Sequence, residues 1–405
     1  GQIIMANVSS SNGLEKRPRL AFRNTDGSHF PCWRQTSLGC IIEPYSEKVY
    51  GEHDYEVLTS SREGLQRQED HFGSKQRHDT DGYNIIPFGY CTYRNRSDDG
   101  KFAFNINTIS EKAIVSKFYP VFRFTNANST FMAEFLNSSP RVKKKLSVLA
   151  VGTSQVVLSF EALKAAKFDL PCKDEQDKIA AFLEFLNTRI ENQRTLVVAL
   201  KKYKRGLLSQ LIAQKKAFDT SGEWKTVKLG HIFKERTERA KGNETLLAVT
   251  ISNGVQRRDE IDLKDNSSDD KSNYKCVYIG DIAYNTMRMW QGASGVSPYN
   301  GIVSPAYTIV TPIRPDLHNM TFWAYYFKYS PLVQTFQKYS QGLTSDTWNL
   351  KFPQFSEIAV TMPPISEQDK IAECLSVFDE HCKCEDEKLQ ALLLVRTSLL
   401  QQLFI

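Results

Sequence analysis

Residues 175–180 read Glu-Gln-Asp-Lys-Ile-Ala, and residues 367–372 read Glu-Gln-Asp-Lys-Ile-Ala again. The match continues without a gap at an offset of about 192 residues, where Leu183 falls on Leu375 and Leu200 falls on Leu392. A repeat of this length indicates a duplicated architecture, and it has to be recognised before any single element is assigned.

Each copy has the pattern of one long helix. Apolar residues recur at alternating spacings of four and three, which is the period of a coiled-coil seam. They are Ile179, Leu183, Leu186, Ile190, Val197, Leu200, Leu207 and Leu211, then Ile371, Leu375, Phe378, Cys382, Leu389, Leu392, Leu399 and Leu403. At ~1.5 Å per residue, roughly 38 residues form a rod of about 57 Å. Two ordinary amphipathic core helices are the alternative, but equal copies in mid-chain and at the C-terminal end favour a spacer rod.

The two helices are predicted to pair antiparallel, because the first leads from domain one to domain two and the second runs back. Full overlap sets Leu183 against Leu399, and it leaves Lys204 and Arg396 with packed stems and charges in water. A slip of one heptad pairs Lys204 with Glu385 but strips apolar layers from one end. Each lost layer costs about 1.5–3 kcal/mol per side chain, whereas an exposed ion pair returns less than about 1 kcal/mol. We therefore predict full overlap.

The segments before the two helices also match each other, at offsets between about 188 and 192 residues. Trp33 matches Trp224, and residues 60–67, 83–93 and 114–119 match 250–257, 274–284 and 302–307. We predict an α+β (mixed α/β) fold with two similar globular domains, separated by a long antiparallel two-helix coiled coil in a pseudo-two-fold internal repeat. The predicted parts are a first domain at 1–170, a spacer helix at 171–215, a second domain at 216–361 and a second spacer helix at 362–405.

Short strands and helices are predicted inside each domain. Stretches rich in Val, Ile and Tyr, bounded by turn residues, predict strands at 121–124, 277–283 and 302–310. Residues 131–145 and 322–336 predict one amphipathic helix closing each domain. The sequence Asp-Thr-Ser-Gly at 219–222 predicts a turn between the halves.

The composition narrows the class of protein. The chain has 405 residues, 41% hydrophobic and 24% charged, which fits two or three folded domains. Its net charge of +6 permits nucleic-acid binding without requiring it. No apolar run approaches the ~18 residues of a membrane span, no signal peptide is visible, and eight scattered cysteines suit a reducing compartment. We therefore expect a cytoplasmic protein.

Motifs of catalysis and metal binding are missing from the sequence. It has no phosphate-binding Gly-x-x-x-x-Gly-Lys loop, no dinucleotide Gly-x-Gly-x-x-Gly fingerprint and no His-Glu-x-x-His helix. His381, Cys382 and Cys384 resemble metal ligands, but helical residues two apart point away from each other. We expect no catalytic residue and no metal site.

Basic, aromatic and amide side chains alternate in two loops. Residues 284–292 read Tyr-Asn-Thr-Met-Arg-Met-Trp-Gln-Gly, and their counterpart at 93–96 reads Tyr-Arg-Asn-Arg. Arginine and asparagine pair with guanine and adenine edges, and cations neutralise phosphates. The alternatives are a structural turn with Met287 and Trp290 packed inward, and solvated arginines elsewhere. The candidate DNA-binding residues are Tyr93, Arg94, Asn95, Arg96, Arg62, Arg67, Tyr284, Asn285, Arg288, Trp290, Gln291, Arg257, Arg258, Thr344 and Ser345.

The order of these motifs resembles the specificity subunit of type I restriction–modification systems. It comprises Trp…Leu-Gly, Tyr-Asn-x-Met-Arg-x-Trp-Gln-Gly, Gly-Ile-Val-Ser-Pro-Ala-Tyr, then Pro…Glu-Gln-x-Lys-Ile-Ala and a Leu-rich helix. The resemblance covers nearly the whole chain after about residue 31 and occurs in both halves. The first half departs from it at 94–96 and 116–119, where Arg-Asn-Arg and Ser-Lys-Phe-Tyr stand in place of the second half's residues.

The resemblance implies a non-catalytic DNA reader. Two target-recognition domains would each read one half of a split, asymmetric duplex DNA site, and the helices would set the unread spacer. Partners would do the chemistry: two modification subunits that methylate adenine from S-adenosylmethionine, and restriction subunits that translocate and cut DNA with ATP and Mg²⁺. Two alternatives stay open, a repressor without a methyltransferase partner and the recognition part of a combined restriction and methylation enzyme. For the latter, two reader–helix units leave no room for a catalytic domain.

Overall fold

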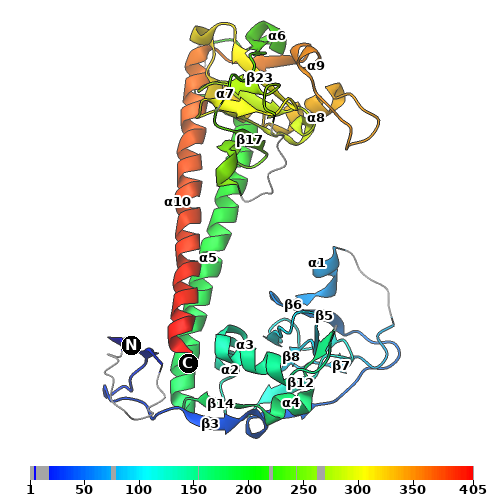
Figure 1. Cartoon of the computed structure of the whole chain (residues 1–405), viewed down its shortest axis with the longest axis vertical. Helices are drawn as coiled ribbons and strands as arrows, with labels where there is room; N and C mark the ends of the chain where they lie inside the picture. The colour runs from blue at the N-terminus through cyan, green and yellow to red at the C-terminus, as the bar shows by residue number, and fades with distance from the viewer. Residues whose placement is uncertain are drawn as a thin grey trace. The chain divides into compact units, whose positions relative to one another are not determined.

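The structure is a computed structural model that describes residues 4–5, 18–73, 79–153, 155–218, 222–242, 244–261 and 270–404. The chain divides into two compact units. Unit 1 comprises Gly1–Gln193 and Lys388–Ile405, and unit 2 comprises Arg194–Glu387. Each unit contains one mixed α/β domain and a section of both long helices, α5 (Lys173–Ile212) and α10 (Ile365–Leu403), drawn in Figure 1. The turn predicted at 219–222 falls largely outside the described residues.

The domain of unit 1 is built on two four-stranded sheets. The first has the order β10-β8-β12-β4, all antiparallel, formed by Phe104–Ile106, Cys91–Tyr93, Val121–Phe124 and Ile42–Tyr45. The second has the order β6-β5-β11-β7, formed by Gly64–Arg67, Glu56–Ser61, Ala113–Val115 and Asn84–Ile85, with β11 parallel to β5. Smaller elements complete it: β2 (Leu20–Ala21), β3 (Arg34–Ser37), α1 (Gln68–Phe72), β9 (Arg96–Ser97), α2 (Ser129–Ser138), α3 (Pro140–Leu149), β13 (Val156–Val157), α4 (Phe160–Ala165) and β14 (Lys167–Leu170).

The domain of unit 2 repeats the first sheet strand for strand. Its order is β21-β20-β23-β16, formed by Ser294–Val296, Ile282–Asn285, Tyr307–Pro312 and Phe233–Glu235. Around it lie β15 (Lys225–Lys228), α6 (Leu229–Ile232), β17 (Leu247–Thr250), β18 (Gly254–Arg257), β19 (Lys275–Val277), η3 (Met289–Gln291), β22 (Gly301–Val303), α7 (Met320–Tyr326), α8 (Ser330–Tyr339), α9 (Phe352–Ser356) and β24 (Ala359–Met362). The predicted mixed fold with an internal repeat is confirmed.

Turns divide four of the predicted elements. The predicted strand at 277–283 is wrong because residues 278–281 turn between β19 and β20, with Gly280 at φ +90° and the Asp281 carboxylate accepting from Tyr278 N at 2.9 Å. The predicted strand at 302–310 breaks at 304–306, where Tyr307 N donates to Ser304 O. The predicted helix at 131–145 ends at Ser138, because Ser139 caps a new helix that has Pro140 in its first turn. The predicted helix at 322–336 also divides, into α7 and α8; α8 has Pro331 in its first turn but no side-chain cap.

The long helices pack antiparallel in each unit, as predicted. In unit 1, Leu186 and Ile190 of α5 form an apolar cluster with Leu389 of α10. In unit 2, the rings of Tyr203 and Phe378 lie 5.4 Å apart. The Tyr203–Phe378 contact and the bond between Lys204 and Asp379 confirm full overlap, because a slip of one heptad would have set Lys204 against Glu385.

The repeated Glu-Gln-Asp sequence docks each domain on its helix. In unit 2, buried Gln368 accepts a hydrogen bond from Asn319 N at 3.0 Å and donates one to Pro363 O at 3.0 Å. Asn319 donates from Nδ2 to Asp369 at 2.7 Å, and its Oδ1 caps α7 by accepting from Phe322 N at 3.0 Å. One asparagine therefore ends the loop, starts the domain helix and contacts the long helix.

Unit 1 contains the same arrangement. Gln176 accepts from Asn128 N at 2.9 Å and donates to Pro171 O at 2.9 Å. Asn128 donates to Asp177 at 2.7 Å and caps α2 through Phe131 N at 3.0 Å. The identical residues in the two halves are thus explained by an identical joint between domain and helix.

Candidate nucleic-acid interface

The 286–293 loop follows β20 and is shaped by its own backbone. The Asn285 side chain accepts from Met287 N at 3.0 Å, and Trp290 Nε1 donates to Met287 O at 3.0 Å. Gly292, at φ +79°, ends the turn η3, which packs on α8. Arg288 and Gln291 are exposed, whereas Trp290 is half-buried. The loop therefore combines a structural turn with two polar side chains directed to solvent.

The 341–349 loop is joined to the 286–293 loop. Gln341 and Asn349 exchange backbone hydrogen bonds of 3.0 and 2.8 Å, and Leu350 N donates to Thr286 O at 2.9 Å. The Trp348 ring packs edge-on against Trp290, with centroids 5.2 Å apart. The tip of the loop carries exposed Thr344 and Ser345 next to Leu343, whose side chain is 100% exposed.

The β17–β18 hairpin approaches the same region of unit 2. A Cβ added to Gly295 would lie 2.7 Å from Gly254 Cα, so only two glycines allow the hairpin turn this close to β21. Arg257 is exposed and lies 5.3 Å from the ring centre of Tyr299. Arg258 is half-buried, and its backbone N donates to Leu246 O.

In unit 1, the β5–β6 hairpin turn meets the 94–101 loop. Arg62 Nη2 donates to Asp99 Oδ1 at 2.6 Å, and Ser97 Oγ donates to the same oxygen at 3.0 Å. Burial acts to raise the pKa of Asp99, but hydrogen bonds from Ser97, Lys101 N and Arg62 outweigh it and lower the pKa to about 2. Arg67, at the end of the same hairpin, pairs with Glu56 at 3.3 Å.

The 94–101 loop also meets the 116–120 loop. The Arg96 guanidinium lies 4.8 Å from the ring centre of Phe118, and Lys117 Nζ lies 5.7 Å from that centre. Phe118 is 46% exposed, and Arg94 is exposed as well. Asn95 is half-buried, and its carbonyl accepts from Leu158 N at 2.9 Å. An exposed aromatic ring between two cations is a surface on which a nucleobase or sugar can pack.

Two of the predicted contact residues are wrong. Tyr93 and Tyr284 each have 0% exposure. Tyr93 donates from its hydroxyl to Leu158 O at 2.9 Å inside the core, and Tyr284 stacks on Phe355 at 5.3 Å. Each is the last inward-facing residue of its central strand, β8 or β20. Their side chains therefore pack in the core beneath the loops and do not face a ligand.

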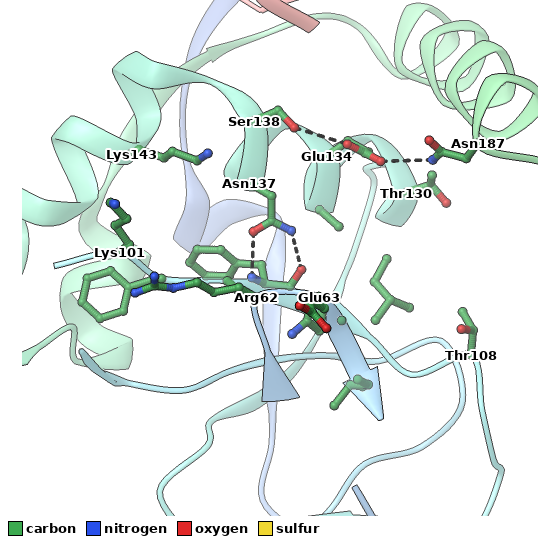
Figure 2. A pocket seen from close by; sticks show the side chains of 18 of the residues that line it. Arg62, Glu63, Lys101, Thr108, Thr130, Glu134, Asn137, Ser138, Lys143 and Asn187 are labelled. Carbon is green, nitrogen blue, oxygen red and sulfur yellow. Dashed lines mark hydrogen bonds between the residues drawn. The ribbon is translucent and has the colours of Figure 1, made fainter. Parts of the chain in front are cut away.

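A cavity of about 760 Å³ lies in unit 1, beside the interface loops (Figure 2). Arg62, Lys101 and Lys143 form a basic side of its wall, and Glu134 and Asn187 lie on the other side. The described residues contain no group of three or more His, Cys, Asp or Glu side chains suited to hold a metal ion. None of their helices is both long and apolar enough to cross a membrane.

Sequence reasoning missed three exposed residues of the interface. Lys117 and Phe118 were noted only as differences from the motif of the second half, and Leu343 was not predicted as a contact residue although its neighbours Thr344 and Ser345 were. The available signal was local: Phe118 stands beside Lys117, and Leu343 stands beside Gly342 and Thr344, so each is an apolar residue within a polar loop.

The type I restriction modification DNA specificity domain family matches this chain twice, at residues 43–200 and 221–394. The chain belongs to that family. Its two matches cover one domain of each unit, so the protein carries two DNA specificity domains.

Two solved structures share the fold along nearly their whole length. The type I restriction–modification S subunit from M. genitalium is 16% identical with a TM-score of 0.56, over 96% of this chain and 99% of that one. A chain from a study of complex assembly and conformational transition of the type I R-M system is 15% identical with a TM-score of 0.54. The match covers 93% of this chain and 98% of that one. At this identity the likeness is one of fold.

Proposed function

We propose that this chain is the DNA-reading subunit of a type I restriction–modification complex and that each specificity domain reads one half of a bipartite, asymmetric duplex site. The observation that carries the proposal is the repetition of one interface with different side chains. Each unit brings together a hairpin turn and the loop after the central strand β8 or β20: Arg62 bonds to Asp99 in unit 1, and Lys328 donates to both Ile251 O and Gly292 O in unit 2. The first sheet has the same strand order in both units, but the loop after β8 exposes Arg94 and Arg96, whereas the loop after β20 exposes Arg288 and Gln291. Different side chains on similar scaffolds suit two different half-sites.

The exposed side chains supply the chemistry of base reading. Arginine donates two hydrogen bonds to guanine, glutamine pairs with adenine, and an apolar side chain packs on the thymine methyl group. Arg288, Gln291 and Leu343 provide one group of each kind in unit 2. Arg96 and Lys117, beside Phe118, provide phosphate or base contacts in unit 1.

The long helices would set the unread spacer and bind the modification subunits. Phe185 and Val377 occupy equivalent positions in the two helix copies and are 67% and 60% exposed. Tyr203 and Val395 form a second equivalent pair, 56% and 49% exposed. Large apolar side chains exposed twice at the same places fit two copies of one partner. S-adenosylmethionine, ATP and Mg²⁺ would then be bound by the modification and restriction subunits.

The decisive experiment is methylated-base sequencing of a host with and without this gene, in the presence of its modification partner. The expected result is one new methylated-adenine motif with two unlike halves and a fixed spacer. An unchanged methylome with the complex assembled would overturn the proposal, and a change in transcription alone would favour a repressor.

DNA binding by the purified chain is a second test. A net charge of +6 is modest for a long bipartite site, because each neutralised phosphate contributes through counterion release. Tight, specific binding is therefore expected only when the modification partner is added. Equal affinity and specificity for the isolated chain would contradict this.

A further inference from the structure

One partly buried cation interrupts the apolar seam of each long helix: the Arg396 side chain is 27% exposed and the Lys204 side chain is 21% exposed, and each makes polar contacts that the sequence did not predict. In unit 1, Arg396 of α10 donates from Nη2 to Glu134 Oε1 at 2.6 Å and from Nε to Asn187 Oδ1 at 2.7 Å. Asn187 of α5 in turn donates to Glu134 at 3.2 Å, as Figure 2 shows. Glu134 belongs to α2, so three side chains close a triangle between both long helices and the specificity domain. Arg396 is 27% exposed and Glu134 is 17% exposed.

Unit 2 contains the corresponding triangle. Lys204 of α5 bonds to Asp379 of α10, and its Nζ lies 4.8 Å from the ring centre of Tyr325 in α7. The Tyr325 hydroxyl donates to Asp379 Oδ2 at 2.6 Å and lies 3.3 Å from Ser376 Oγ. Burial and then the hydrogen bond to Asp379 raise the pKa of Tyr325, so the phenol stays a donor.

The two triangles occupy equivalent places in the repeat. Lys204 corresponds to Arg396, and Asp379 corresponds to Asn187, at the same offset of about 192 residues. The chemistry differs, since an Arg–Glu–Asn set in one unit stands where a Lys–Tyr–Asp set stands in the other. In both, the cation comes from the long helix that follows the other specificity domain in the chain, α10 for the domain of unit 1 and α5 for the domain of unit 2.

A stability role alone does not explain these cations. A partly buried charge loses hydration, and well-packed apolar residues of similar volume are often at least as stable. Polar groups placed in an apolar seam characteristically fix register and orientation at a cost in stability. Here each cation contacts the partner helix and the domain together, so register and domain orientation are fixed by the same side chain.

We infer that Arg396 and Lys204 are positioning residues that hold each specificity domain at one rotation about its own section of the helix pair, and thereby restrict the spacer length the protein accepts. This inference rests on the proposed function. One extra base pair moves a half-site by about 3.4 Å and turns it by about 35° around the duplex. A domain free to rotate by that angle would accept a spacer one base pair longer or shorter.

The test is the spacer of the methylated motif, measured by methylated-base sequencing of a host that expresses the full chain with its modification partner. For Arg396→Ala we expect unchanged bases in both half-sites and new methylation at spacers one base pair longer or shorter. Preference for the native spacer should fall by about tenfold or more, since two charge-assisted hydrogen bonds are lost. Arg396→Lys should restore part of the preference, and Arg396→Glu combined with Glu134→Arg should restore more than either change alone.

Lys383→Ala is the matched control, because Lys383 is a cation on the same helix with a side chain that is 79% exposed. It should leave the spacer unchanged. If the Arg396→Ala variant does not accumulate, the inference is tested with Arg396→Lys and with the double variant Arg396→Glu, Glu134→Arg. Variants that assemble and methylate only the native spacer, or that change the half-site bases, would overturn the inference. If the parent chain gives no bipartite motif, the proposed function itself fails.

Discussion

Replacing Gln368 with alanine should loosen helix α7 in unit 2 while leaving unit 1 intact. Gln368 is fully buried where the domain meets the long helix, and it satisfies Asn319 N and Pro363 O at the same time. Alanine removes both partners and admits no replacement, because the site is closed. Asn319 N–H and the Pro363 carbonyl would remain buried without partners.

The magnitude follows from those two groups. Each buried donor or acceptor that loses its partner costs about 1–3 kcal/mol, so the pair costs about 2–6 kcal/mol. Local opening of α7 should then become roughly 30- to 20,000-fold more frequent, at a factor of ten per about 1.4 kcal/mol. Gln368→Glu separates the two bonds: its carboxylate still accepts from Asn319 N but cannot donate to Pro363 O. Burial should raise the pKa of this new carboxyl group, so the variant should regain stability as pH falls and the proton returns.

Amide hydrogen exchange read by mass spectrometry measures this locally, which suits a chain of two units that need not unfold together. Faster exchange is expected in 320–326 for Gln368→Ala and in 129–138 for the matched change Gln176→Ala. Gln401→Ala, an exposed glutamine on the same helix, should change neither segment. Unchanged protection of α7 in Gln368→Ala would refute the docking role of the repeated motif.

Three further outcomes test the interface and its support. Arg288→Ala should weaken recognition of one half-site by about 1–3 kcal/mol in a binding assay with the modification partner, whereas equal weakening on every sequence would make Arg288 a phosphate contact. Leu343→Ser should remove discrimination between thymine and deoxyuracil in the second half-site, worth about 0.8 kcal/mol for one methyl group; equal discrimination in parent and variant would exclude that contact. Burial and the charge of Lys204 lower the pKa of Lys328 from 10.5 to about 8, so between those values the unfolded chain binds more protons and stability rises with pH. Lys328→Met should flatten that rise in denaturant titrations at pH 8 to 10, and an equal slope would contradict the assignment.

The long helices and their register could be predicted because spacing alone determines them. A seam of apolar residues every three or four positions leaves one face to bury, and displacing it by a heptad removes whole layers. The break within 131–145 was missed because a helix cap is a local hydrogen bond, here from Val142 N to Ser139 Oγ. The break within 322–336 has no side-chain cap and lies just before Pro331. Apolar periodicity continues across such a cap, so the pattern shows one helix where two meet.

The candidate site was predictable in composition but not in orientation. Tyr93 and Tyr284 stand next to basic residues in sequence, yet each is the last inward-facing residue of a strand, and one position decides whether a side chain faces the core or the solvent. Contacts between distant loops, such as Arg96 with Phe118, depend on strand order, which no local pattern encodes. Such contacts can be identified only once the three-dimensional fold is known.

The repeat separates three kinds of residue by how they compare between halves. Gln176 and Gln368 are identical and make identical bonds, as a joint must if both domains are to sit alike on their helices. The exposed loops differ, as they must if the half-sites differ. Arg396 and Lys204 occupy equivalent positions but bond to different partners, so each cation is matched to the specificity domain of its own unit. Exchanging such a cation without its partners would therefore disturb orientation while leaving both the joint and the reading loops in place.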